Sequence, residues 1–316
     1  MTPTTLPSPV IGLDLGGTKI DAALVGADGT ILARHSLPTP AAEGAEAVLD
    51  ALAEAAAAVR DARAETIGVA AAGVIDPVSG TVTSATDTIR GWAGTALAAG
   101  LAARTGLAVA CDNDVRAAAG TELASLDGPD GSLIYAAVGT GVGGAVAAGG
   151  RMLHGARGIA GHLGHLPSPE AAGLPCTCGA TGHLEAIAAG PGIATHYAAV
   201  TGTAPGPLQR VAAYARCGDP HAVAAITLGA RAVGRALGGL ANALGPDRVV
   251  VAGGVSRIGP LYQDALSEAF AAELMSPLAQ LTPSAPRVGH DAAVLGGAAL
   301  TRTLPLHPPR TTGASR

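Results

Sequence analysis

The pattern that most constrains the fold of this chain is a glycine-rich turn between two apolar segments, and it occurs twice. The first copy spans residues 10–25 (VIGLDLGGTKIDAALV) and the second spans residues 133–148 (LIYAAVGTGVGGAVAA). Apolar runs of this length, bounded by turn residues, are typical of buried strands, so each copy predicts a β-hairpin. Two related domains that hold one nucleotide would supply two such hairpins, although a simple duplication of hairpins would give the same pattern.

The first turn carries groups suited to phosphate and to a divalent cation. Gly16 and Gly17 can adopt φ > 0 and let backbone amides approach an anion without a Cβ atom in the way. Thr18 adds a hydroxyl donor, and Lys19, the only lysine in the chain, adds a compact positive charge. Asp14 lies inside the apolar segment, where burial without a partner is costly, and hydrated Mg²⁺ beside phosphates is a suitable partner. An ordinary hairpin turn with a capped aspartate is the alternative interpretation.

A second acidic group stands where a strand is expected to end and a helix to begin. Asn113 and Asp114 follow an apolar segment and precede a helical one. A carboxylate at this junction can accept a proton from a substrate hydroxyl, and phosphoryl transfer otherwise needs mainly positioning and charge neutralisation. Either residue can instead cap the helix. With two glycine turns in the same chain, we favour the catalytic interpretation for Asp114.

Two cysteines and two histidines lie close together in a loop-rich region. They are His165, Cys176, Cys178 and His183. Two thiolates and two imidazoles suit a tetrahedral Zn²⁺ ion, and four protein ligands leave no position open for a substrate. The spacing therefore predicts a structural zinc that braces a loop with little core of its own, and chance clustering is the alternative. Four cysteines in a chain of this length do not predict a disulfide framework.

The same region offers groups that can bind a polar substrate. His162, His165 and Glu185 supply imidazoles and a carboxylate, which suit hydrogen bonding to sugar hydroxyls. A single histidine is more often an ordinary core or surface residue. Several in one loop favour a substrate pocket.

Composition restricts the class of protein. The 316 residues are 48% hydrophobic and 14% charged, which predicts a large packed core and room for two domains. A net charge of −5 and only 2% aromatic residues argue against a nucleic-acid partner. The opening residues lack the basic and apolar segments of a secretory signal, and no apolar run is long and unbroken enough to predict a membrane span. We therefore expect a cytoplasmic protein with no membrane association.

Local patterns also predict individual elements outside the two hairpins. We expect strands over residues 29–35, 66–72, 80–83, 107–110 and 248–252. We expect helices over residues 41–64, 96–104, 115–126, 184–197, 221–244, 261–274 and 294–303. This alternation of strands and helices predicts an α/β protein.

Taken together, the motifs resemble those of the bacterial ROK-family sugar kinases, in the hexokinase/actin-like ATPase superfamily. The resemblance spans roughly residues 10 to 303 and rests on DLGGTK (14–19), CDNDVRAAAG (111–120), GTGVGG (139–144), GIAGHLGH (158–165), CTCGATGHLEA (176–186), VVVAGGV (249–255) and DAAVLGGAAL (291–300). It implies an α/β, two-domain actin-like ATPase (hexokinase/ribonuclease H-like) fold with an inter-domain cleft. We expect an N-terminal lobe at residues 1–115 plus 292–316 and a C-terminal lobe with the zinc-braced substrate loop at residues 116–291.

The resemblance also implies an ATP-dependent kinase that phosphorylates the 6-hydroxyl of a hexose or N-acylhexosamine, commonly as a homodimer. The ATP phosphates and Mg²⁺ would be held by the two glycine turns, through Asp14, Gly16, Gly17, Thr18, Lys19, Thr140, Gly141 and Gly143. Gly253 and Gly254 would lie beside the adenosine. Asp114 would be the base, and the sugar would contact Gly73, Asn113, His162, His165 and Glu185, with His165 also binding zinc.

Three positions depart from the family pattern. His183 stands where the family usually has a third cysteine, and an imidazole can replace that thiolate as a zinc ligand. His162 replaces a sugar-binding glutamate that the glucokinases of the family keep, and the resulting AGHLGH form resembles the bacterial N-acetylmannosamine kinases. The asparagine usually found shortly before Gly91-Trp92 is missing, so either Asp87 substitutes for it or that sugar contact is absent.

These departures order the candidate functions. A neutral imidazole can donate a hydrogen bond to an N-acetyl carbonyl, which a carboxylate cannot, so N-acetylmannosamine is the first choice and glucose the alternative. A non-catalytic sugar-binding protein is a further alternative, favoured only by His162 and the 86–90 segment. A sugar-responsive regulator of this family would carry a DNA-binding segment ahead of the domain, and only nine residues precede the first expected strand.

Overall fold

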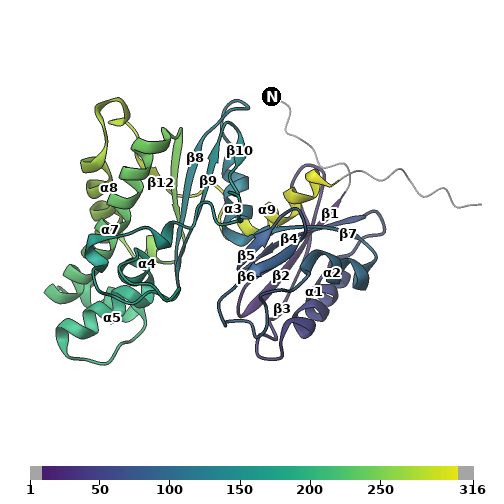
Figure 1. The fold of residues 1–316 in the computed structure, drawn as a ribbon, viewed down its shortest axis with the longest axis horizontal. Helices are drawn as coiled ribbons and strands as arrows, with labels where there is room; N and C mark the ends of the chain where they lie inside the picture. Colours follow the sequence, from purple (N-terminus) through teal and green to yellow (C-terminus); the bar gives the residue numbers. More distant parts are fainter. Residues whose placement is uncertain (1–8, 305–316) are drawn as a thin grey trace, which may run out of the picture. The chain divides into compact units, whose positions relative to one another are not determined.

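The computed structural model describes residues 9–304, which divide into two compact α/β units. Unit 1 takes the described residues of Met1–Ala118 and of His290–Arg316, and unit 2 is Ala119–Gly289. Each unit is built on a five-stranded sheet with helices packed against it (Figure 1). The chain is therefore mixed α/β, as the alternation of strand and helix patterns predicts.

The sheet of unit 1 has the strand order β3-β2-β1-β4-β7. β1 (Val10–Leu15) pairs antiparallel with β2 (Lys19–Val25) and parallel with β4 (Thr66–Ala71), while β3 (Ile31–Pro38) and β7 (Ala108–Asn113) form the edges. The other elements are α1 (Ala45–Val59), β5 (Val74–Asp76), β6 (Thr81–Ser84), α2 (Leu97–Thr105), the start of α3 (Asp114–Leu123) and α9 (Ala292–Leu300).

Small residues let α9 pack directly on the backbone of this sheet. A Cβ atom added to Gly12 of β1 would lie 2.2 Å from the carbonyl oxygen of Val294 in α9. One added to Gly68 of β4 would lie 1.8 Å from the carbonyl oxygen of Gly297. Because side chains alternate along a strand, the neighbouring Leu13 points to the opposite face, where it joins the core formed with α1. The two faces of the sheet are thus covered by different helices.

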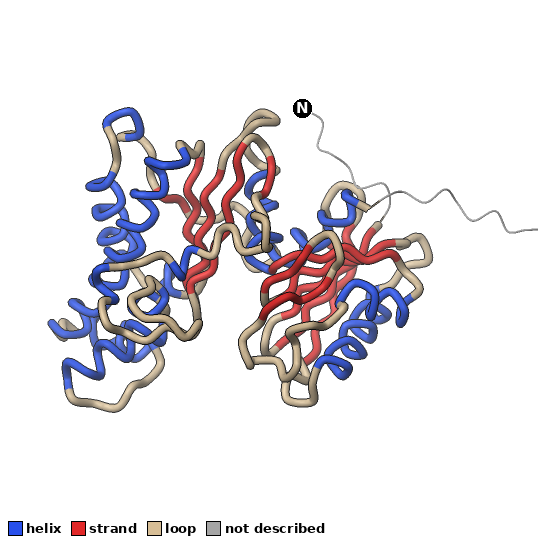
Figure 2. Tube along the Cα trace, viewed as in Figure 1, coloured by secondary structure: helices blue, strands red, loops and turns tan. Residues whose placement is uncertain are grey.

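Unit 2 repeats the strand order as β10-β9-β8-β11-β12. β8 (Leu133–Val138) pairs antiparallel with β9 (Val142–Ala148) and parallel with β11 (Arg248–Ala252), while β10 (Arg151–Met152) and β12 (Pro283–Ser284) form the edges. The helices are α4 (Glu185–Ala188), α5 (Gly190–Thr201), α6 (Leu208–Arg216), α7 (Pro220–Leu244), α8 (Pro260–Glu273) and the second half of α3. Figure 2 shows that the segment between β10 and α4 is mostly loop.

One helix of the described chain, α7, has the length and apolar composition that a membrane span requires. Half of its apolar window is buried inside unit 2. There, Ile226, Val233 and Leu237 belong to the same hydrophobic core as Tyr262 and Phe270 of α8. This packing accounts for the apolar character of α7 as that of a core helix.

The predicted bounds of two strands are confirmed, and one helix prediction is wrong. The strands at 133–138 and 248–252 have the predicted bounds. The single helix expected over 184–197 is instead two helices, α4 and α5, separated at Ala189, whose backbone is extended. Pro191 explains the break, because it has no N–H group and its ring would clash with the carbonyl one turn earlier.

Candidate functional site

In unit 1, β7 ends and α3 begins at two adjacent polar residues. Oδ1 of Asn113 accepts hydrogen bonds from the backbone N–H groups of Val115 (3.1 Å) and Arg116 (3.2 Å), so Asn113 caps α3. Its amide Nδ2 donates to Oδ1 of Asp114 (2.8 Å) and to the carbonyl oxygen of Gly73 (3.0 Å). The sequence allowed either Asn113 or Asp114 as the helix cap, and the structure shows that Asn113 is the cap. Asn113 also orients the Asp114 carboxylate.

Asp14 at the end of β1 is close enough to Asp114 for their charges to interact. The pKa of Asp14 is raised to about 7, first by burial and then by the charges of Asp114 and Asp21, whereas Lys19 lowers it. Burial also raises the pKa of Asp114, against the opposing effects of hydrogen bonds to its charged form and of the Arg116 charge. Perturbed carboxyl groups in one place are typical of a functional site, and they suit a divalent cation and a proton acceptor.

The first glycine turn follows directly after β1. The N–H of Gly16 donates to the carbonyl oxygen of Lys19 (3.0 Å) and closes the turn. Neither Gly16 nor Gly17 has a positive φ, so the left-handed backbone that their sequence permits is not used. A Cβ atom at Gly17 would lie 2.6 Å from Cγ2 of Thr88, so a larger residue here would require the exposed Thr88 side chain to shift.

The two polar residues of this turn are exposed. Thr18 lies at its tip, and its carbonyl oxygen accepts a hydrogen bond from the Thr39 N–H (3.0 Å). Lys19 has 61% of its side chain exposed, and its Nζ lies 2.6 Å from Oδ2 of Asp21. The ion pair accounts for the position of Lys19 within unit 1. The contact of Lys19 with phosphate stays a prediction.

In unit 2, the second glycine turn joins β8 to β9 and contacts Glu185. The N–H of Val142 donates to Oε2 of Glu185 (2.9 Å), and a Cβ atom at Gly141 would lie 2.7 Å from the same oxygen. The hydroxyl of Thr177 donates to the other carboxylate oxygen, Oε1 (2.6 Å). Glu185 therefore links the glycine turn to the cysteine-containing loop. The other two predicted residues of the turn are Thr140, which is exposed at its tip, and Gly143 in β9.

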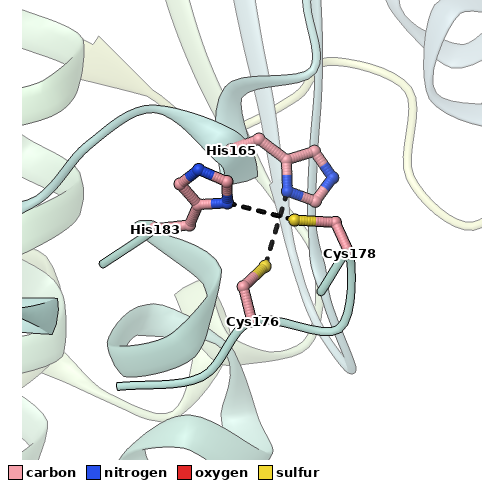
Figure 3. A group of neighbouring side chains, drawn as sticks. All are labelled: His165, Cys176, Cys178 and His183. Atoms are coloured by element: carbon pink, nitrogen blue, oxygen red, sulfur yellow. Dashed lines mark hydrogen bonds between the residues drawn. The ribbon is translucent and has the colours of Figure 1, made fainter. Parts of the chain in front are cut away.

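Four side chains with metal-binding atoms converge in the loop between β10 and α4 (Figure 3). The ligand atoms of His165, Cys176, Cys178 and His183 all lie within 4.8 Å of one another. Sγ of Cys176 lies 3.5 Å from Nδ1 of His165, and Sγ of Cys178 lies 3.2 Å from Nδ1 of His183. Bonds of about 2.3 Å to sulfur and about 2.1 Å to nitrogen place tetrahedral ligands about 3.6 Å apart, so the four residues fit a zinc ion.

His162 lies beside this cluster. Its ring stacks on that of His165, with centroids 6.3 Å apart and an angle of 17° between the planes. The ring of His165 in turn meets that of His183 edge-on at 5.4 Å. The three imidazoles therefore lie next to one another, and His162 is not one of the four residues with converging ligand atoms.

The carboxyl end of β11 borders a cavity of about 460 Å³. Gly253 stands there with a φ of 96°, and a Cβ atom would lie 2.2 Å from the carbonyl oxygen of Val138, so only glycine fits. Gly254, the next residue, is exposed. Tyr262 of α8 lines the cavity, and its buried hydroxyl has no hydrogen-bond partner among the described residues. The volume is typical of a small-molecule site.

Within each unit, some of the predicted site residues lie together. In unit 1 the group contains Asp14, Gly73, Asn113 and Asp114, and in unit 2 it contains Glu185, His162 and the four-residue cluster. Three contacting residues had no role predicted from sequence, namely Thr88, Thr177 and Arg116. Only Arg116 has a local signal, since it follows Asp112 by four positions across the β7–α3 junction and pairs with it.

Comparisons with known proteins agree over nearly the whole chain. The model of the ROK family matches residues 10–303. The N-acetylmannosamine kinase of Escherichia coli (strain 55989 / EAEC) is 37% identical over 301 residues, covering 92% of this chain and 98% of the relative. That of Shigella flexneri is 37% identical over 302 residues, covering 93% and 98%.

Two solved structures extend the similarity to the fold. The ROK hexokinase of Thermus thermophilus has a TM-score of 0.80 at 36% identity, covering 92% of this chain and 97% of that one. A ROK family glucokinase of Streptomyces griseus, in complex with glucose and AMPPNP, has a TM-score of 0.77 at 31% identity, covering 93% and 99%.

Proposed function

The chain belongs to the ROK family, and from this premise we propose that it is an ATP-dependent sugar kinase that phosphorylates the 6-hydroxyl of an N-acylhexosamine, with N-acetylmannosamine as the first candidate. Its two units have the actin-like ATPase fold of the ROK sugar kinases. The observation that carries the proposal is the Asp114 carboxylate, oriented by Asn113 at the end of β7.

Asp114 is the proposed general base. Its Oδ1 accepts a hydrogen bond from the Asn113 amide, which orients the carboxylate that is proposed to take the proton of the sugar hydroxyl. As the 6-oxygen of the sugar forms a bond to the γ-phosphorus, the bond from that phosphorus to the β–γ bridging oxygen breaks and the hydroxyl proton passes to Asp114. The products are the sugar 6-phosphate and ADP. Asn113 and Gly73 are proposed to contact the sugar beside the base.

The two glycine turns are proposed to hold the phosphates of ATP. In unit 1 these are the backbone amides of Gly16, Gly17 and Thr18, with Lys19 as a nearby cation. In unit 2 they are those of Thr140, Gly141 and Gly143. Asp14 is proposed to hold hydrated Mg²⁺, which neutralises phosphate charge when bound.

The adenosine of ATP is proposed to lie beside Gly253 and Gly254, next to the 460 Å³ cavity. An analogue of ATP in the related Streptomyces griseus glucokinase structure supports ATP as the donor. We propose that the lobes are residues 1–115 plus 292–316 and residues 116–291.

His165, Cys176, Cys178 and His183 are proposed to bind one structural zinc. Two thiolates and two neutral imidazoles satisfy a tetrahedral ion, which supplies cross-linking rather than substrate activation. The cross-link would brace the loop that carries Thr177 and would fix His162 through its stacking on His165.

His162 is proposed to select the N-acyl group. A neutral imidazole has an N–H donor for an N-acetyl carbonyl oxygen, whereas the carboxylate of a glutamate has only acceptors. His165 and Glu185 are proposed to contact sugar hydroxyls. The two N-acetylmannosamine kinases at 37% identity support this order of substrates, while the glucokinase at 31% identity keeps glucose as the alternative.

We further propose a homodimer in the cytoplasm with no nucleic-acid or membrane partner. The net charge of −5 and the burial of α7 in the core of unit 2 support the last two points. A non-catalytic sugar-binding protein or a regulator is less favoured, because Asp114 and both glycine turns are present.

A coupled assay of ADP release over a panel of sugars tests the proposal. We expect kcat/KM for N-acetylmannosamine to exceed that for glucose by about tenfold or more, as for a site built to hydrogen-bond a group that the competitor lacks. A preference for glucose would contradict N-acetylmannosamine as the substrate and favour the glucokinase alternative. Failure of every sugar to stimulate ADP release would contradict the kinase proposal itself.

A further inference from the structure

A buried ion pair flanks the proposed catalytic base. Nε of Arg116 in the first turn of α3 lies 2.8 Å from Oδ1 of Asp112 at the end of β7. The side chains are only 1% and 5% exposed, respectively. Arg116 is among the largest fully buried side chains in the described part of the chain. A charge pair this deeply buried lies directly against Asn113 and Asp114.

The position of Arg116 is electrostatically unfavourable for stability alone. The N-terminal turn of a helix repels a positive charge, because the unpaired N–H groups give it partial positive character. Removing two charges from water also costs more than their attraction returns in many buried pairs. These costs indicate that the pair does more than stabilise the fold, and the groups that it holds in place show what that is.

The pair joins β5 to the β7–α3 junction. Nη2 of Arg116 donates to the carbonyl oxygen of Ile75 in β5 (3.2 Å). Oδ1 of Asp112 accepts from the backbone N–H of Asn113 (2.7 Å). Asn113 then returns to the same segment by donating to the carbonyl oxygen of Gly73 (3.0 Å), two residues before Ile75. The four interactions form a closed circuit around Asn113.

Asn113 is also the residue that orients the base, through its 2.8 Å hydrogen bond to Oδ1 of Asp114. Its Nδ2 can reach both Gly73 and Asp114 only while the 73–75 segment stays at its present distance from the junction. The guanidinium of Arg116 fixes that distance, because its planar fork can contact the carboxylate and the carbonyl at once.

We propose that Arg116 is a positioning residue for the phosphoryl transfer: together with Asp112 it holds Asn113, and through Asn113 the Asp114 carboxylate, in the orientation that accepts the sugar proton. The inference rests on the proposed kinase function, and it concerns a residue that does not touch the substrate.

The test compares Arg116→Met, Arg116→Lys and the double variant Asp112→Asn/Arg116→Met in the full chain. We expect Arg116→Met to lower kcat by about 10- to 100-fold, with KM for ATP within about twofold of wild type, because misplacement of a base affects the chemical step. Arg116→Lys keeps the charge without the fork and should recover part of kcat. Arg231→Met is the matched control, since it breaks an exposed ion pair with Glu268 in unit 2.

The double variant separates positioning from stability. It removes both charges, so no unpaired buried charge remains, and the neutral amide oxygen introduced at position 112 can still accept the Asn113 N–H. We expect its thermal midpoint to recover toward wild type while kcat stays low, because the tie to Ile75 is gone. Recovery of kcat together with the midpoint would overturn the inference, as would an unchanged kcat in Arg116→Met.

Trp92 gives a readout that needs no catalysis. It is the only tryptophan in the chain, it is 2% exposed, and its Nε1 donates to the carbonyl oxygen of Ala72, next to Gly73. We expect acrylamide to quench its fluorescence more strongly in Arg116→Met and in the double variant, but not in Arg231→Met. If the wild type phosphorylates no sugar, the kinase proposal fails. Unchanged quenching in Arg116→Met would show, independently of catalysis, that Arg116 does not hold the 73–75 segment.

Discussion

The two units of this protein share one strand order and differ in what their loops carry. In each, an antiparallel hairpin with a glycine turn leads into parallel strands. In unit 1 the ends of β1 and β7 carry the carboxylates of Asp14 and Asp114. In unit 2 the glycine turn contacts Glu185 at the start of α4, and Glu185 contacts Thr177 in the loop with clustered thiols and imidazoles. One frame therefore supports two chemistries, because strand order decides where loops emerge and loop residues decide what they do.

The units also hold their functional groups in different ways. The proposed base in unit 1 accepts a hydrogen bond from Asn113, beside a buried ion pair between Arg116 and Asp112. The loop of unit 2 has little regular structure around its four-residue cluster, and a metal ion is the proposed cross-link. Unit 1 should therefore be sensitive to charge and unit 2 to metal.

The largest expected effect is on the chemistry of unit 1. Asp114→Asn removes the proton acceptor while keeping the shape of the side chain, and we expect kcat to fall by about 10²- to 10⁴-fold. Steady-state rates at saturating ATP and sugar measure it. Asp61→Asn, which alters an exposed carboxylate paired with Arg63, serves as the control. Retention of more than about a tenth of wild-type kcat would remove Asp114 as the base.

The second-largest expected effect is a loss of zinc and of thermal stability when a ligand in unit 2 is removed. His183→Ala deletes one of four ligands, so we expect zinc content to fall well below one per chain and the thermal midpoint to drop, because metal binding is coupled to folding of the loop. Elemental analysis and a thermal melt with and without chelator measure both. Cys217→Ser, an exposed cysteine outside the cluster, should change neither. Wild-type protein purified without zinc and insensitive to chelator would contradict the metal site.

A third effect concerns the pH dependence of stability in unit 1. The folded-state pKa of Asp14 is about 7, against 3.8 ordinarily, so the folded protein holds this proton more tightly than the unfolded chain. The resulting stabilisation is complete below about pH 4 and is lost as pH rises through about 7, on the order of a few kcal/mol.

Asp14→Asn removes the titrating carboxyl group. We therefore expect the free energy of unfolding of the ligand-free variant to fall less than that of wild type between pH 4 and pH 8. Urea unfolding at several pH values measures the difference. Asp28→Asn, in the exposed turn after β2, is the comparison of opposite sign: Thr30 donates hydrogen bonds that lower the pKa of Asp28, so losing this carboxylate should not reduce the stability lost as pH rises. An identical pH dependence in Asp14→Asn and wild type would contradict the raised pKa.

The smallest expected effect is a change of substrate preference in unit 2. His162→Glu replaces a hydrogen-bond donor by an acceptor, so we expect the ratio of kcat/KM for N-acetylmannosamine to that for glucose to fall by about tenfold. The sugar panel measures the ratio directly. His221→Glu, on an exposed position in the first turn of α7, should leave it unchanged. An unaltered ratio in His162→Glu would show that another residue reads the N-acyl group.

The sequence by itself determined the features whose signals are local. Apolar runs between glycines predicted β8 and β11 with correct bounds, and the strand-to-helix junction placed Asn113 and Asp114. The spacing of His165, Cys176, Cys178 and His183 predicted a cluster, and the structure brings their ligand atoms within 4.8 Å of one another. These signals need no knowledge of distant residues, because side-chain periodicity and turn chemistry act within a few positions.

Only the tertiary structure decided which distant residues meet. Arg116 reaches Ile75 across 41 positions, and Glu185 reaches Val142 across 43. Likewise, only the folded chain brings the Thr88 side chain to 2.6 Å from the place where a Cβ atom at Gly17 would lie. The physical reason is that a pattern tells which face of an element is buried, whereas strand order and packing select the element that covers it.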